Sequence, residues 1–461
     1  MNETGSIKDA RQLGIPKMLI LGLQHMFAMF GATVLVPILV NSYFQGQGMS
    51  VQVTLFAAGA GTLIFHLITK RKVPAFLGSS FAFLGGYAAI AALNTGVYAS
   101  MPMHEKLAYA NGGVVVAGLL YLLLALVIKL AGVKKVMRFL PPVVTGPIII
   151  CIGLSLAPSA IGNAATNWPL AIIAFLVVVF FEIWGRGMFK IIPILMGVVI
   201  AYFFALGFNA AGMTNADGSA ILNFSRVASA SPVALQPFFL CKFDITAVLV
   251  MAPIAIAAMM EHIGDISAIS ATVGQNFITD PGLNRTLVGD GIATAFSAII
   301  GGPANTTYGE NTGVLELSGV HDPKVIRLAA LYAILLSFSP KFAEIITTMP
   351  AAIIGGISFI LYGMISAIGV RNVVENRVDF TRTRNLIIAA VILVSGLGFS
   401  EGLTFQVGGA HITLTSLAIA SILGIIMNAV LPGNDYVFME GDMSEIKNDL
   451  MLDEESRKHH R

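Results

Sequence analysis

Apolar runs about as long as a membrane-spanning helix recur along the whole chain. A helix needs roughly 20 such residues to cross the hydrocarbon core of a bilayer. Twelve clear runs lie at 18–40, 51–69, 113–130, 142–157, 169–184, 191–206, 245–260, 286–300, 326–338, 350–368, 386–399 and 414–431. Apolar residues make up 56% of the chain and charged residues only 11%, which excludes a soluble globular protein. The sequence therefore predicts an all-α polytopic membrane protein.

Two weaker, glycine-rich stretches at 74–93 and 301–317 raise the expected number of segments to fourteen. They contain similar sequences, PAFLGSSFAFLGG from Pro74 and PANTTYGENTGV from Pro303. A pair of polar residues precedes each stretch, Gln24-His25 in the first half and Glu261-His262 in the second. Gly and Pro interrupt a helix, and such backbone is tolerated at membrane depth only where it lines a cavity in the protein. Seven segments per half is an odd number, so the halves must form two inverted seven-segment repeats, with the substrate between the broken segments.

The positions of Lys and Arg indicate the orientation. If the N-terminus is inside and all fourteen segments cross, all but four of the 27 Lys and Arg residues lie near inner loops, the exceptions being Lys106, Arg226, Lys242 and Lys341. This asymmetry predicts both termini in the cytoplasm, with a leader at 1–16, a tail at 433–461, an extracellular loop at 209–242 and a location in the cell (plasma or inner) membrane. The net charge of +2 is too small to suggest a nucleic-acid partner.

Two acids are the strongest candidates for a buried site. Glu261 and Asp265 are four residues apart and share a helix face, with His262 about 100° aside. These charges could simply mark the inner end of the eighth helix, an interpretation that fits Asp265 better than Glu261. The second acid, Glu310, lies within the second glycine-rich stretch.

Glu261 and Glu310 together would suit a flat, neutral ligand rich in N–H donors. Burial and mutual repulsion favour the protonated form of one acid, so a proton could be cotransported. Backbone amides near Phe81 and Gly309 could donate to ligand carbonyls, and the Phe81 ring could contact a planar ligand. Tyr308 and Asn311 flank Glu310 and join this candidate substrate site.

Three further polar residues lie inside apolar segments. Gln24 and His25 could form a hydrogen bond between helices or contact the ligand. Asp290, in the sequence GDG, could assist proton movement or pair with helices of the first half. The Cys and the other His residues show no metal-binding spacing, and the catalytic patterns Ser-His-Asp, phosphate loop and HExxH are not found. We expect no enzyme activity, no metal and no cofactor beyond a coupling proton.

Five motifs resemble the nucleobase/ascorbate transporter family (nucleobase:cation symporter 2), and within it the bacterial uracil permeases. They are LQHMFAMFGATVLVP (23–37), PAFLGSSFAF (74–83), EHIG (261–264), DPGL (280–283) and NTTYGENTGV (305–314). The resemblance implies short antiparallel strands in segments 3 and 10, a core domain (17–131 and 243–340) and a gate domain (132–208 and 341–432). It also implies uracil:proton symport by a homodimer, with the substrate beside Glu261 and Glu310 and with backbone donors at Phe81 and Gly309.

Two positions refine the resemblance. Purine members typically carry Gln before the Asn, so Glu310-Asn311 indicates a pyrimidine. The best-known uracil permease has His where this chain has Asp265, which argues against a proton relay through that position and favours protonation of Glu261 or Glu310 itself, while Asp265 and His262 remain candidates for proton coupling or structural polar residues. The alternative is a purine (xanthine or uric acid) or other nucleobase permease of the same fold.

Overall fold

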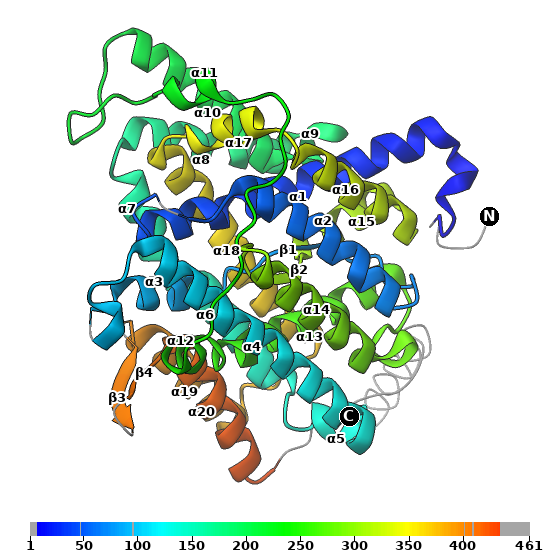
Figure 1. Ribbon diagram of the computed structural model, residues 1–461. Coiled ribbons are helices and arrows are strands. Elements are labelled where there is room, and N and C mark those ends of the chain that lie inside the picture. Colours follow the sequence, from blue (N-terminus) through cyan, green and yellow to red (C-terminus); the bar gives the residue numbers. More distant parts are fainter. Residues whose placement is uncertain (1–6, 47, 95, 401, 408–409, 434–461) are drawn as a thin grey trace.

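The computed structural model of the chain describes residues 7–46, 48–94, 96–400, 402–407 and 410–433 (Figure 1). Within these residues, seven helical spans are long and apolar enough to cross a membrane. They are α1 (Ile15–Tyr43), α2 (Val51–Ile68), α4 (Met103–Ala131), α6 (Pro142–Ser155) with α7 (Ala157–Ala164), α10 (Pro193–Ala210), α12 (Ile245–Met251) with α13 (Ile254–Val273), and α18 (Ala351–Glu375). An eighth arises if α16 (Pro323–Leu336) and α17 (Pro340–Thr347), which meet at a 90° bend, are counted together.

Shorter elements complete the described part of the fold. Three more helices are apolar, namely α8 (Trp168–Trp184), α19 (Thr383–Gly398) and α20 (Ser416–Val430). The others are α3 (Leu84–Ala92), α5 (Val133–Met137), α9 (Met188–Ile191), α11 (Ser225–Ser229), α14 (Leu283–Ile299), α15 (Gly309–Ser318), the 3-10 helices Ala10–Leu13 and Gly96–Tyr98, and a π-helical turn at Ile278–Gly282. The helical architecture agrees with the predicted all-α membrane protein, whereas the count of fourteen segments stays a prediction.

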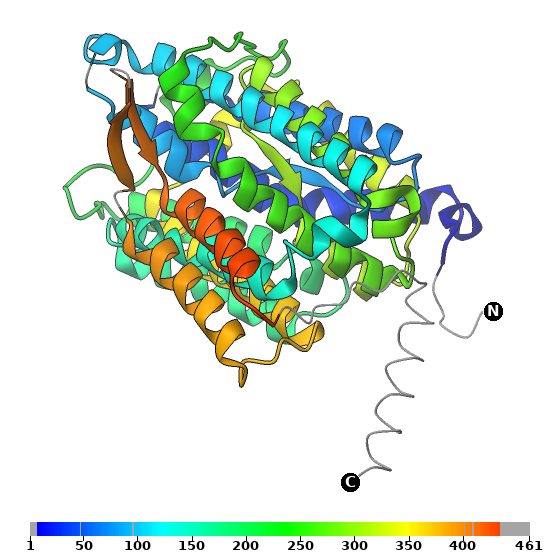
Figure 2. The same cartoon turned by 90° about the horizontal axis from the view of Figure 1, so that it is seen from below.

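The strands form two small antiparallel sheets. β1 (Leu77–Ser79) pairs with β2 (Asn305–Thr307), so the two glycine-rich stretches meet, and Figure 2 shows this pair in the interior among the helices. β3 (Leu403–Val407) pairs with β4 (Ala410–Leu414) between α19 and α20. This hairpin was not predicted from the sequence.

The helices pack in two groups. In the first, α2 lies against α14 and α16, α4 packs on α14, α12 and α3, and α1 packs on α16 and α3. In the second, α18 packs on α6, α7 and α8, while α10 packs on α8 and α19 packs on α20 and α6. The two groups meet where α13 contacts α6 and α20 and where α1 contacts α10. The β1–β2 pair belongs to the first group, close to this boundary.

Helix α13 is longer than the sequence indicated. The eighth apolar run was expected to end near residue 260, but α13 continues to Val273 and ends at Gly274, which takes the left-handed conformation favoured at helix C-termini. Asp265 is consequently in the middle of the helix and only 3% exposed. The interpretation of this cluster as a solvated helix end is therefore wrong.

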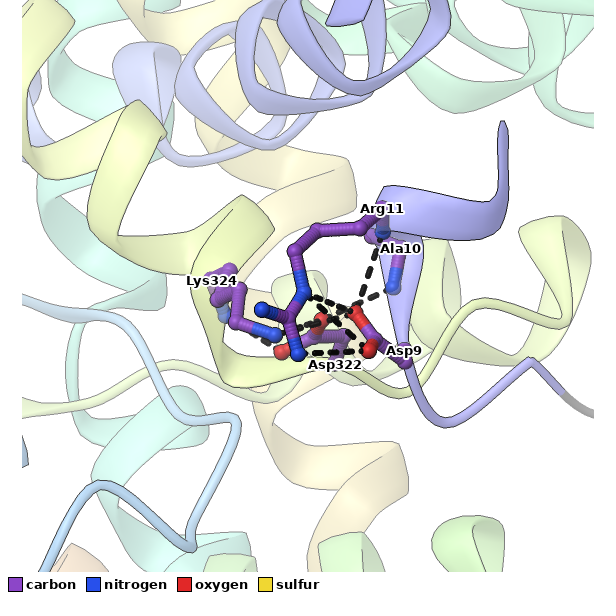
Figure 3. A network of polar contacts seen from close by, with 5 residues as sticks. All are labelled: Asp9, Ala10, Arg11, Asp322 and Lys324. Atoms are coloured by element: carbon purple, nitrogen blue, oxygen red, sulfur yellow. Dashed lines mark hydrogen bonds and ion pairs between the residues drawn. The ribbon is translucent and has the colours of Figure 1, made fainter. Parts of the chain in front are cut away.

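The first described residues lie against the turn between α15 and α16 (Figure 3). The Ala10 amide donates to Asp322 Oδ2 at 2.8 Å, and Asp322 also caps α16. Lys324 contacts both Asp322 and Asp9, at 3.3 and 3.0 Å, and Arg11 contacts Asp9 at 2.8 Å. Residues 7–11 of the predicted leader are thus bound to the turn between α15 and α16.

Candidate functional site

The β1–β2 pairing is locally two-fold symmetric. Its register pairs Leu77 with Thr307, Gly78 with Thr306 and Ser79 with Asn305. The ladder continues at both ends, because the Ser80 amide donates to Ala304 O at 2.8 Å and the Tyr308 amide donates to Phe76 O at 3.0 Å. A half-turn about the central pair exchanges these two bonds. The same half-turn relates Phe81 to Gly309.

Hydroxyl side chains of α2 and α14 bond to the strands at matching positions. Thr62 Oγ1 of α2 accepts a hydrogen bond from the Leu77 amide at 2.9 Å. Thr294 Oγ1 of α14 donates to Asn305 O at 2.9 Å. The half-turn relates Leu77 to Asn305, so α2 and α14 are equivalent supports of the sheet.

The outer residues of the strands bond to α1 and α13. Ser79 Oγ donates to Thr33 O of α1 at 3.1 Å, and its two-fold mate Thr307 donates to Asp265 Oδ2 of α13 at 2.9 Å. On α1, the group that bonds to β1 is thus the Thr33 carbonyl, and the match of Gln24-His25 with Glu261-His262 stays a prediction.

Each strand leads into a short helix whose start lacks a side-chain cap. The residues before α3 and α15, Phe83 and Tyr308, supply no capping hydrogen bond. The amides of Phe81 and Gly309 likewise have no hydrogen-bond acceptor among the described residues. Unpaired amides and the positive ends of two helix dipoles favour an electronegative ligand atom, such as a carbonyl oxygen.

Tyr308, predicted to bind substrate, is engaged within the sheet. Its hydroxyl donates to Ser79 O at 3.0 Å and accepts from Thr33 Oγ1 at 3.4 Å. Its ring lies on Gly78, where an added Cβ would be 2.3 Å from Tyr308 Cζ. The close approach requires glycine at position 78, and Tyr308 holds the two strands and α1 together.

Three polar residues of α13 lie in the interior beside the sheet. Glu261 is 9% exposed, and His262 is fully buried. His262 Nδ1 lies 2.9 Å from Asp290 Oδ2 on α14, which is also fully buried. The ion-pair partner of Asp290 therefore lies on a second-half helix rather than on a first-half one, and a role for Asp290 in proton movement stays a prediction. His262 Nδ1 is also 3.5 Å from Thr307 Oγ1, which links this pair to Asp265.

His25 and Asn311 form a polar contact between α1 and α15, and Gln24 precedes His25 on α1. Asn311 Nδ2 donates to His25 O at 3.0 Å and lies 3.3 Å from His25 Nδ1. Of the two possibilities for His25, the structure shows the hydrogen bond between helices. Gln24 Oε1, His25 Nε2 and Asn311 Oδ1 are buried without a hydrogen-bond partner in the described part of the chain. Buried polar atoms of this kind are usually satisfied by a ligand or water.

The starts of both half-helices face α18. The Phe81 ring, 4% exposed, meets the Tyr362 ring edge-on with centroids 5.8 Å apart. A Cβ added to Gly309 would lie 2.8 Å from Ile368 Cδ1 and 3.7 Å from Asp265 Oδ1. Tyr362 was not among the predicted site residues, because an apolar run with one aromatic residue carries no functional signal.

Glu310 is the second residue of α15, directly after Gly309. Its side chain lies outside the described part of the structure, so its predicted contact with Glu261 stays a prediction. No group of three or more His, Cys, Asp or Glu side chains in the described ranges could hold a metal ion.

Comparison with known proteins identifies the family. Residues 16–405 match the family described as "Permease family" (Xan_ur_permease), which is the nucleobase/ascorbate transporter family. The chain belongs to this family. The permease is thus a multi-pass membrane transport protein rather than an enzyme, as the sequence predicted.

Two relatives are similar over almost the whole permease. The uracil permease of Bacillus caldolyticus is 40% identical over 428 residues, which cover 90% of this chain and 91% of the relative. The uracil permease of Bacillus subtilis (strain 168) is 39% identical over 429 residues, which cover 89% and 91%. Among solved structures, the transmembrane domain of a cyanobacterium bicarbonate transporter, BicA, matches with a TM-score of 0.58 at 16% identity, over 86% of this chain and 97% of that one. This last likeness concerns the fold alone.

Proposed function

We propose that the permease imports uracil together with a proton. Two observations support this. The relatives named uracil permease span about nine tenths of the chain, and two uncapped half-helices meet at the β1–β2 sheet beside buried acids of α13. The second observation carries the proposal, because this arrangement offers both donors and acceptors to one small planar ligand.

Each part of the sheet region has a role in uracil binding under this proposal. The carboxylates of Glu261 and Glu310 accept hydrogen bonds from the ring N–H groups, as carboxylates are acceptors when ionised. The amides of Phe81 and Gly309 donate to the two ring carbonyls. The Phe81 ring packs on the base.

The coupling proton neutralises an acid of the same region. An ionised carboxylate inside a membrane costs roughly 3 kcal/mol or more, so a proton that enters with uracil lowers the barrier to moving the site. Glu261 and Glu310 are the first candidates to carry it. The bonded series formed by Asp265, Thr307 and His262 lies next to Glu261 and is the second candidate.

Alternating access follows from the two helix groups. We assign the first group to a core domain (17–131 and 243–340) and the second to a gate domain (132–208 and 341–432), related as two inverted seven-segment repeats. Phe81 against Tyr362 and Gly309 against Ile368 are contacts between these domains. Movement of the core against α18 would open the sheet region to each side in turn, with both termini in the cytoplasm and two copies in a homodimer.

The direct test compares Glu261→Ala with Glu316→Ala, since Glu316 is an exposed acid on α15, the helix that carries Glu310. Uptake of labelled uracil into proteoliposomes should be lost in Glu261→Ala and kept in Glu316→Ala, with equal amounts of folded protein. Full uptake by Glu261→Ala would contradict the site. Collapse of the pH gradient should abolish accumulation above the outside concentration, and uphill uptake without a proton gradient would contradict proton symport.

A ligand screen tests the substrate separately. Ligands that bind the folded state raise its apparent Tm. Purified permease should be stabilised by uracil and not by xanthine, ascorbate or sulfate. Stabilisation by xanthine instead would assign the permease to purines.

A further inference from the structure

We propose that the ends of α2 and α16 on the predicted cytoplasmic side bind the phosphate headgroup of an anionic phospholipid. The site is formed by Lys70, Arg71 and Arg327, and it is separate from the sheet region. The proposal goes beyond transport, because it concerns a lipid of the surrounding leaflet rather than the transported molecule.

A strained turn presents the first two cations. Lys72 N donates to Thr69 O at 3.2 Å, which closes a tight turn directly after α2. Its two central residues, Lys70 and Arg71, have φ values of 56° and 59°. Turns of this kind usually carry Gly, Asn or Asp at these positions, because other side chains rarely adopt positive φ. Backbone strain of this kind persists mainly at sites where it serves a function.

Further basic groups surround the turn. Arg285 of α14 donates to Ile68 O at 3.3 Å, which places it at the end of α2. Arg327 lies on α16, which packs against α2, the helix that ends at this turn. Arg327 Nη1 is buried and has no hydrogen-bond acceptor among the described residues. A guanidinium is a rigid set of donors matched to phosphate oxygens, so an anion would satisfy this atom.

The nearby acids are engaged elsewhere. Asp280 forms an ion pair with Lys72. Asp322, directly before α16, accepts hydrogen bonds from the Ala10 amide and from Lys324. The cluster of Lys70, Arg71 and Arg327 therefore keeps an excess of positive charge.

An apolar strip continues from the cluster along the helices. Leu331 and Leu335 follow Arg327 by four and eight residues on α16, so they share its face, and they are 47% and 67% exposed. Leu67, at the end of α2, is 63% exposed. The two helices touch closely, since a Cβ added to Gly59 would lie 2.5 Å from Ala330 O.

This order, a cationic cluster at the helix ends and exposed leucines toward the membrane interior, matches a phospholipid with its headgroup and acyl chains. Basic pockets between helix ends on the cytoplasmic side are known to bind anionic headgroups. The apolar strip is the reason to assign a lipid rather than a soluble phosphate.

Lipid titration of the detergent-purified permease tests the proposal. Phosphatidylglycerol should raise the apparent Tm, and phosphatidylcholine should not. The apparent affinity for phosphatidylglycerol should fall about tenfold or more in Arg71→Gln/Arg327→Gln and stay unchanged in the control Lys134→Gln/Lys135→Gln, a pair of exposed lysines on α5. An equal effect of inorganic phosphate, or equal loss in the control, would overturn the assignment.

A second variant separates binding from folding. Lys70→Gly/Arg71→Gly removes two charges and also relieves the positive-φ strain. Its apparent Tm without lipid should rise, while its shift with phosphatidylglycerol should shrink, and uracil should still stabilise it. An intact phosphatidylglycerol shift in this variant, or a lower lipid-free Tm, would overturn the proposal.

Discussion

The contact between Gly78 and Tyr308 allows a sharp test of the sheet as the centre of the site. In Gly78→Ala the new Cβ would lie 2.3 Å from Cζ and 2.4 Å from Cε2 of Tyr308, and 2.8 Å from Thr33 Oγ1. Carbon atoms in contact are normally about 3.5–4.0 Å apart. The Tyr308 ring must therefore move by more than about 1 Å, and backbone on both sides limits that movement.

The expected cost follows from two contributions. Overpacking of a tight interior costs about 1–3 kcal/mol. A displaced ring also loses the bond from Tyr308 to Ser79 O, worth about 0.5–1.5 kcal/mol. The sum is a destabilisation of about 1.5–4.5 kcal/mol, concentrated at the strands that place the Phe81 and Gly309 amides.

Gly85→Ala is the matched control in the same glycine-rich stretch. Gly85 is an exposed position of α3, and an added Cβ there meets no atom within 4 Å. Alanine is favoured over glycine in a helix by about 0.5–1 kcal/mol, so this variant should be as stable as the parent or more stable. Apparent Tm and uracil uptake, measured side by side, should fall in Gly78→Ala and be retained in Gly85→Ala.

A double variant isolates the proposed clash. Tyr308→Ala creates space above position 78, so Gly78→Ala should cost much less in that background than in the parent. Contacting residues show coupling of about 0.5–3 kcal/mol. Strictly additive losses, or normal uptake by Gly78→Ala alone, would refute the reasoning.

Two further predictions concern charges. Asp290→Ala leaves His262 buried without its partner and should destabilise the fold by about 3 kcal/mol or more; Asp290→Ala/His262→Leu should recover part of the loss in apparent Tm, and no recovery would contradict the pairing. Arg11 and then Lys324 hold the pKa of Asp9 well below its ordinary value of 3.8. The contribution of Asp9 to docking is thus complete above pH 3.8 and is lost only as the pH falls through the lowered pKa. Protease sensitivity of residues 7–13 should be constant between about pH 7 and 5, and Asp9→Asn should raise it throughout; a rise on acidification to pH 5 would contradict this assignment.

The sequence located the centre of the fold because Gly and Pro cannot continue a helix through a membrane. Both stretches that it marked contain the paired strands, with the close approach at Gly78 and the start of α15 at Gly309. The sequence also indicated that Glu261 and Asp290 are buried, because charged residues within apolar runs are easy to recognise. These signals are local and can be read from neighbouring residues.

The partners of those charges could not be predicted. Asp265 is bonded to Thr307, which is 42 residues away in the chain, and His262 lies beside Asp290 on another helix. The hydropathy pattern predicted that the eighth segment ends at these charged residues, because it treats every charged residue as exposed to water. In the structure the charged side chains have partners in the interior, which offset the cost of burying them, and α13 therefore continues to Val273. Thr33 was missed for the opposite reason, since its contribution is a backbone carbonyl that any residue offers.

The two-fold symmetry of the supports would allow the proposed proton chemistry to be confined to one half. Thr62 and Thr294 bond through uncharged hydroxyl groups to strand residues that the half-turn relates. Where the first half offers only the Thr33 carbonyl to Ser79, the second half offers the Asp265 carboxylate to Thr307. An acid on α13 can therefore gain or lose a proton while the first half keeps β1 in place. The strands are thus supported symmetrically, but only the second half places a carboxylate against its strand. Under the proposed function, protonation of an acid on α13 could then change the affinity for the ligand without unfolding the backbone that positions it.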